Sequence, residues 1–188
     1  MKIDYYTPFY SNQFYHIYNR GNNGEKIFYT EENYAYFLRR YDHYISNYAD
    51  TYAYCLLSNH FHFLIKIIDK NKLVNQLRFF FLSYSKAINQ QTGRKGSLFQ
   101  KRFKRTIIED KSSLIKAALY IHSNPVHHKI SADFRKYMYS SYLSLMSDKR
   151  TKLKREEVFE WFGGRESFIK SHKQKLSEFN SEKFFLED

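Results

Sequence analysis

The sequence predicts an α+β protein with one main domain and a short helical extension at its C-terminal end. Segments rich in aromatic and β-branched residues, typical of strands, alternate with segments whose apolar residues recur every three or four positions, typical of amphipathic helices. A length of 188 residues suits one domain with a substantial core. We therefore expect a domain over residues 1–148 and a charged helical extension over residues 149–188.

Four segments have strand character, and they cover residues 14–20, 51–57, 60–68 and 106–109. Because successive side chains of a strand point to opposite faces, His60 and His62 should project together from the third segment. The apolar Phe61, Phe63 and Ile65 should then face the other way. Two neutral imidazoles at this spacing supply half of a divalent-metal site, although an ordinary polar strand face gives the same pattern.

Three long helices are predicted, over residues 31 to about 48, about 71 to 91, and 111 to about 123. Thr30 can cap the first, whose stripe of tyrosines we expect in the core. The third should end near Ser123, because Pro125 biases the residue before it away from helical geometry. In the extension, Gly163 and Gly164 separate two short amphipathic helices.

The composition favours a polyanionic partner. The chain has 31 Lys and Arg against 19 Asp and Glu, a formal net charge of +12, and 20% aromatic residues. Cations suit phosphates and rings allow bases to stack, although rings also build cores and charge also keeps a protein soluble. The single cysteine, Cys55, excludes an intrachain disulfide. With no apolar run of signal-peptide or membrane-spanning type, we expect a cytoplasmic protein without a membrane partner.

Three regions are candidates for contact with nucleic acid. Segment 93–105 holds six cations around two glycines and two phenylalanines, which suits a phosphate backbone but also a solvated face. The loop over residues 20–24 offers backbone amides and polar side chains, or is a plain turn. The helix over residues 71–91 carries cations outside its apolar stripe, which indicates a nucleic-acid groove or a second packing surface. The candidate residues are Arg20, Asn22, Arg78, Lys86, Arg94, Lys95, Arg102, Lys104 and Arg105.

Tyr120 lies outside the predicted core face of the helix that starts at residue 111. On a helical wheel it aligns with Lys116 one turn earlier and Asn124 one turn later. A half-exposed tyrosine followed by a helix C-cap would give the same pattern. A surface shared by a tyrosine, a lysine and an amide is the alternative.

Five motifs occur in order along the chain: YHIYNRGN at 15–22, SNHFH at 58–62, SLFQKRFK at 97–104, YIHSNPV at 120–126 and SSY at 140–142. Together they resemble the REP-associated tyrosine transposases, domesticated relatives of the single-tyrosine HUH insertion-sequence transposases. The resemblance implies a ferredoxin-like antiparallel β-sheet flanked by α-helices. It also implies that His60, His62 and Asn124 bind a divalent metal, Mg²⁺ or Mn²⁺, and that Tyr120 is the nucleophile. Lys116, one turn earlier on the helical wheel, could then support that nucleophile.

The activity implied by the resemblance is cleavage and rejoining of single-stranded DNA near imperfect palindromes through a 5′-phosphotyrosine, by a monomer or homodimer. The sequence departs from the family pattern at Ser58, at Lys101 and over residues 127–129, and the last two departures could alter DNA preference. A non-catalytic single-stranded nucleic-acid-binding module explains charge and aromatics equally well, but gives the histidines and Tyr120 no joint role. A histidine-triad hydrolase would need a third alternating histidine where this chain has Leu64.

Overall fold

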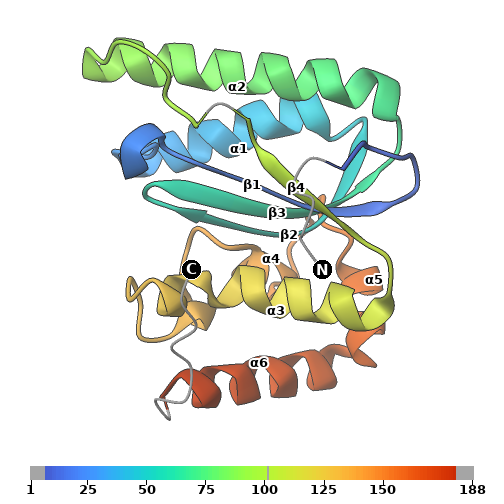
Figure 1. Ribbon diagram of the computed structural model, residues 1–188. Coiled ribbons are helices and arrows are strands. Elements are labelled where there is room, and N and C mark those ends of the chain that lie inside the picture. The colour runs from blue at the N-terminus through green and yellow to red at the C-terminus, as the bar shows by residue number, and fades with distance from the viewer. Residues whose placement is uncertain (1–6, 101, 181–188) are drawn as a thin grey trace.

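A four-stranded antiparallel sheet forms the middle layer of the protein (Figure 1). The computed structural model describes residues 7–100 and 102–180. The strands are β1 (Phe14–Arg20), β2 (Ala49–Leu57), β3 (His60–Ile67) and β4 (Lys104–Ile108), in the order β2-β3-β1-β4, and the neighbouring pairs are antiparallel. The predicted α+β class is confirmed.

Helices cover both faces of this sheet (Figure 1). One face carries α1 (Glu31–Ile45) and α2 (Lys70–Thr92), and the other carries α3 (Lys111–His127), α4 (Ser141–Met146), α5 (Arg155–Phe162) and α6 (Arg165–Asn180). The connection β1-α1-β2-β3-α2-β4 with this strand order is the ferredoxin-like topology. Among the described residues, no helix has the length and apolar character needed to cross a membrane.

The ends of α1 and α2 follow from local capping. Thr30 and Asn33 form a reciprocal capping box at the start of α1. The Asp69 side chain accepts hydrogen bonds from the Asn71 and Lys72 amides in the first turn of α2, and Gly93 ends that helix with a left-handed φ of 67°. Tyr48 lies beyond α1 rather than in it, because its carbonyl accepts the amides that lead from β3 into α2.

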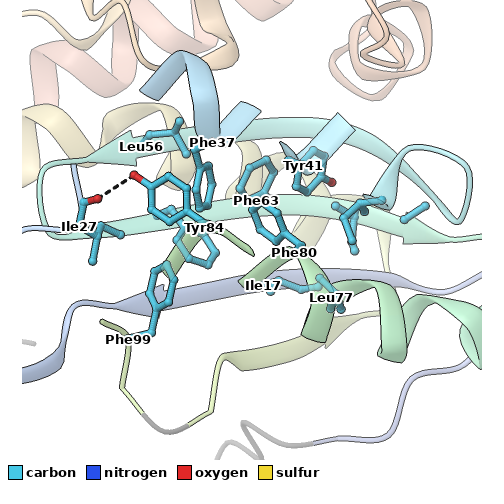
Figure 2. Packing of buried hydrophobic residues seen from close by; sticks show 14 of the residues in the cluster. Ile17, Ile27, Phe37, Tyr41, Leu56, Phe63, Leu77, Phe80, Tyr84 and Phe99 are labelled. Carbon is cyan, nitrogen blue, oxygen red and sulfur yellow. Dashed lines mark hydrogen bonds between the residues drawn. The ribbon is translucent and has the colours of Figure 1, made fainter. Parts of the chain in front are cut away.

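Aromatic rings build the core between the sheet and the α1–α2 layer (Figure 2). The ring of Phe37 lies 4.8 Å from that of Tyr84, and Tyr41 stacks on Phe63 with centroids 4.3 Å apart. The buried Tyr84 hydroxyl donates to the Ile27 carbonyl at 2.7 Å, so its polar atom is satisfied. The core role predicted for the tyrosine stripe of α1 is confirmed for Tyr41.

A second core lies between the opposite face of the sheet and the remaining helices. Leu64 of β3, Ile121 of α3, Tyr142 of α4, Val158 of α5 and Phe168 of α6 are all buried in it. The helices predicted for the C-terminal extension are present and pack here. The boundary at residue 148 stays a prediction.

A buried chain of hydrogen bonds ties α6 to α3, α4 and β2. His172 Nδ1 donates to the Phe168 carbonyl at 2.8 Å, so His172 Nε2 accepts from His122 Nδ1 at 2.9 Å. His122 Nε2 in turn accepts from the Ser141 hydroxyl at 2.8 Å, and that hydroxyl accepts from the Tyr54 amide. Burial lowers the pKa of His172 to about 4 and that of His122 well below its usual value, so both rings are neutral at pH 7.

Helix α3 is longer than predicted, since it continues through Pro125 to His127. Proline has no amide hydrogen to donate to the Ile121 carbonyl, and this loss normally disfavours proline inside a helix. The backbone beyond the proline compensates, because the His128 amide donates to the Asn124 carbonyl at 2.9 Å and the Pro125 carbonyl accepts two further amides. The extra turn keeps Asn124 and His127 in helical register with Tyr120.

Candidate active site

The strand histidines face α3, as the alternation of β3 predicts. His60 and His62 are 8% and 5% exposed, whereas Phe61 and Phe63 belong to the core on the opposite face. On β1, Tyr18 pairs with His62, and their rings stack with centroids 5.5 Å apart. The structure therefore brings a β1 tyrosine beside the predicted metal ligands.

His16 of β1 contacts His62 directly. His16 Nε2 and His62 Nδ1 lie 2.9 Å apart, and the two rings stack with centroids at 5.1 Å. Burial lowers the pKa of His16 to about 4, and burial together with neighbouring imidazoles holds the pKa of His62 well below its usual value. Both rings are neutral at pH 7, and neutral imidazole is the form that binds metals.

Helix α3 places the Tyr120 ring against the histidines, and Asn124 follows one helical turn later. The ring centroid of Tyr120 lies 5.7 Å from that of His62 and 5.9 Å from that of His16, edge-on to both. Tyr120 is 39% exposed, whereas Asn124 is fully buried and donates through Nδ2 to the Tyr120 carbonyl at 2.8 Å. Lys116 and Tyr120 are both exposed, but Asn124 is not. The three residues therefore do not share the open surface that the helical wheel suggested.

Two buried atoms at this site lack a hydrogen-bond partner among the described residues, His62 Nε2 and Asn124 Oδ1. An orphaned buried polar atom costs stability, so such atoms indicate a missing ligand or a functional strain. An imidazole nitrogen and an amide oxygen are both donors that divalent metals accept. The residues present thus fit a divalent ion, although within the described ranges no three His, Cys, Asp or Glu side chains form a metal-holding group by themselves.

Two further imidazoles come from the end of α3. The His128 ring lies 4.5 Å from that of His60, and the His127 ring lies 6.5 Å from that of Tyr120. Both contribute to the lowered pKa of His62. Sequence reasoning missed them as site residues because the helix was expected to stop before Pro125. It missed His16 too, although the spacing of His16 and Tyr18 on one strand face was a usable signal.

Part of the predicted nucleic-acid-binding set lies beside these histidines. Arg20 pairs with His60 at the end of β1, is exposed, and leads into η1 (Asn22–Gly24). Lys104 of β4 pairs with Tyr18, and its ammonium lies 5.7 Å from the centre of that ring. Arg102 is exposed just before β4. Arg20 and Lys104 therefore border the histidine face, and together with Arg102, two residues before Lys104, they form what we call the cationic rim.

The loop that carries Arg20 has a fixed shape. A Cβ at Gly21 would lie 1.9 Å from the Glu25 carbonyl oxygen, so no other residue fits there. The Gly21 amide donates to the Asn59 carbonyl, and the Asn22 amide donates to the Leu98 carbonyl. The loop thus packs on both the β2–β3 turn and the basic segment.

Other predicted cations have structural roles or lie elsewhere. Arg94 pairs with Glu25 at 2.6 Å, and the Arg105 guanidinium donates to the Thr7 carbonyl and lies over the Phe9 ring. Arg105 is on the α1–α2 side of the sheet, since it pairs with the core residue Ile17. Three more exposed cations complete the set: Arg78 and Lys86 on α2, across the sheet from Tyr120, and Lys95 just after that helix.

The fold and the side chains on its α3 face define a ferredoxin-like protein with a histidine-lined polar site beneath a tyrosine-bearing helix. A solved structure with the same fold is a REP-associated tyrosine transposase bound to a REP hairpin. The two match with a TM-score of 0.64 and 15% sequence identity, over 79% of this chain and 87% of that chain. No protein-family model matches the sequence, and no curated protein is significantly similar to it.

Proposed function

We propose that this chain is a metal-dependent, single-stranded DNA transposase or endonuclease that uses Tyr120 as its nucleophile. The observation that carries the proposal is the meeting of three features at one place. The exposed Tyr120 ring stands edge-on to His62, and the two buried atoms without partners, His62 Nε2 and Asn124 Oδ1, belong to predicted ligands. The shared fold with the REP-associated tyrosine transposase supports it.

In this proposal Tyr120 forms a covalent bond to DNA. Its phenolic oxygen attacks a phosphorus atom, the bond from phosphorus to the 3′ oxygen breaks, the phenolic proton leaves, and the departing oxygen takes up a proton. The product is a 5′-phosphotyrosine and a free 3′-OH. Because the phosphoester bond is retained, the same step in reverse rejoins the strand without a nucleotide cofactor. Lys116, exposed one turn before Tyr120, stays a candidate for supporting the ionised phenol.

His60, His62 and Asn124 are the residues that would hold the divalent ion, Mg²⁺ or Mn²⁺. When bound there, it would polarise a phosphate oxygen and stabilise the negative charge that develops in the transition state. The protein itself excludes water and positions the nucleophile. The buried histidine face excludes water from one side, and α3 holds Tyr120 at the open side, where a strand of DNA can reach it.

The DNA in this proposal lies along the cationic rim formed by Arg20, Arg102 and Lys104. Phosphate contacts of this kind give affinity that depends on salt and tolerates sequence changes. Tyr18, stacked beside His62 with Lys104 over its ring, offers an aromatic surface next to the site. By analogy with the REP hairpin bound in the solved structure, we infer single-stranded DNA with short imperfect palindromes as the substrate.

The competing function is a non-catalytic module that binds single-stranded nucleic acid. It shares the cationic rim but requires neither Tyr120 nor the orphaned ligand atoms. Incubation of the purified protein with a hairpin-bearing single strand and Mn²⁺ separates the two functions. A covalent protein–DNA band on a denaturing gel, absent in chelator, is expected for the transposase, and tight binding without such a band on any tested hairpin would favour the module.

A further inference from the structure

Both strand histidines meet a protein partner through the same ring nitrogen. His60 Nδ1 lies 2.7 Å from Asn59 Oδ1, and His62 Nδ1 lies 2.9 Å from His16 Nε2. A neutral imidazole carries one proton, so the partner at Nδ1 decides whether Nε2 is a lone pair or an N–H group. The chemistry of the site therefore depends on residues that are not ligands.

The proton on His60 follows from the orientation of Asn59. The Asn59 amide group donates through Nδ2 to the Gly24 carbonyl at 3.2 Å, which leaves its oxygen to face His60. An amide oxygen only accepts hydrogen bonds. His60 must donate, so its proton is on Nδ1 and its Nε2 carries the lone pair.

The proton on His62 is assigned from the proposed metal site, because Nε2 is buried without a partner in either tautomer. If His16 were the donor, His62 would carry its proton on Nε2, which is buried without an acceptor among the described residues. If His62 is the donor, Nε2 instead presents a buried lone pair. Only the second arrangement leaves an atom that a cation can satisfy, and a neutral His16 is able to accept.

We propose that Asn59 and His16 are positioning residues that hold His60 and His62 as Nδ1–H tautomers, so that both Nε2 lone pairs are available to one divalent ion. This inference rests on the proposed function, because it assigns outer partners to the proposed metal site. Metal-binding histidines generally donate their second ring nitrogen to an acceptor, and loss of that acceptor weakens metal affinity about 10–100-fold. Here the acceptors are an amide and a second imidazole rather than carboxylates.

The wild-type protein without metal tests the inference first. Long-range ¹H–¹⁵N correlation spectra distinguish the two imidazole tautomers of each histidine. We expect His60 and His62 both as the Nδ1–H form at pH 7 in the presence of chelator. An Nε2–H form at either residue would overturn the assignment for that residue, whatever the variants show.

Paired substitutions then test the link to metal affinity. His16→Gln places an amide oxygen where Nε2 was, so an acceptor for His62 remains. His16→Phe keeps an aromatic ring but removes the acceptor. By calorimetry with Mn²⁺, we expect affinity within a few-fold of wild type for the glutamine variant and about 10–100-fold weaker for the phenylalanine variant. Wild-type affinity in His16→Phe would refute the positioning role.

Asn59 offers the same comparison. Asn59→Asp keeps an acceptor for His60 and Asn59→Leu removes it, so only the leucine variant should lose Mn²⁺ affinity. Equal affinity in the two variants would exclude Asn59. Absence of Mn²⁺ binding in the wild type would instead refute the proposed metal site, and the tautomer spectra would then decide separately whether His16 and Asn59 orient the rings.

Discussion

Replacing Tyr120 with phenylalanine removes one hydroxyl and should abolish chemistry without disturbing the fold. The side chain is 39% exposed and its ring contacts with His16 and His62 are edge-on, so phenylalanine can keep them. A substitution of this kind changes stability by about 0.5 kcal/mol, or about 1 kcal/mol if one hydrogen bond is lost. For a chain of this length that corresponds to a shift in Tm of at most about 2–4 °C.

The covalent adduct should disappear completely, because the missing oxygen is the atom that would bond to phosphorus. The assay is denaturing electrophoresis of the protein with a hairpin-bearing single strand and Mn²⁺, alongside thermal unfolding and DNA binding of the same preparations. Tyr29→Phe is a matched control, since Tyr29 is 41% exposed and precedes α1. Adduct formed by Tyr120→Phe on DNA that the wild type cleaves would refute the assignment.

Three further predictions concern the rim, the loop and the buried histidine chain. Neutralising Arg102 and Lys104 to glutamine should lower the slope of log affinity against log salt for single-stranded DNA, by about 1 for each lost phosphate contact. Gly21→Ala should destabilise the protein and weaken DNA binding, because its methyl group would clash with a backbone carbonyl. As pH falls from 6.5 toward 4, the unfolded chain takes up a proton that buried His172 does not, so His172 should contribute about 1.4 kcal/mol per pH unit to the loss of stability, and His172→Phe should lower the slope by about that amount in urea unfolding.

Each of these has a control within the chain. The pair Arg78→Gln and Lys86→Gln removes the same charge from the far side of the sheet. An equal effect on the salt slope would show that Arg102 and Lys104 contact DNA no more than these distant cations do. Gly93→Ala introduces strain at a positive φ but meets open space, so a cost as large as that of Gly21→Ala would contradict the clash. A pH dependence unchanged in His172→Phe would show that other groups control it.

The sequence was sufficient to predict the strands and the faces of β3, because alternation and helical periodicity are local signals. It also aligned Asn124 with Tyr120 on a helical wheel, although the helix was predicted to end near Ser123. The end of that helix could not be predicted, since Pro125 argues for termination and only the backbone pairing beyond it sustains the last turn. The contact of His16 with His62 depends on the register between β1 and β3, which sequence spacing does not fix. The roles of Arg94 and Arg105 likewise depend on partners distant in sequence, Glu25 and Thr7.

The two orphaned atoms at the site also have a thermodynamic consequence. A buried acceptor without a partner costs about 1–3 kcal/mol, and the two hydrophobic cores, one on each face of the sheet, do not include these atoms. The metal-free fold should therefore persist in chelator, and Asn124→Leu should leave it no less stable than the wild type. Loss of a proposed ligand would then cost the fold little stability, so a descendant of this chain could lose the proposed cleavage while keeping its fold and the proposed DNA binding.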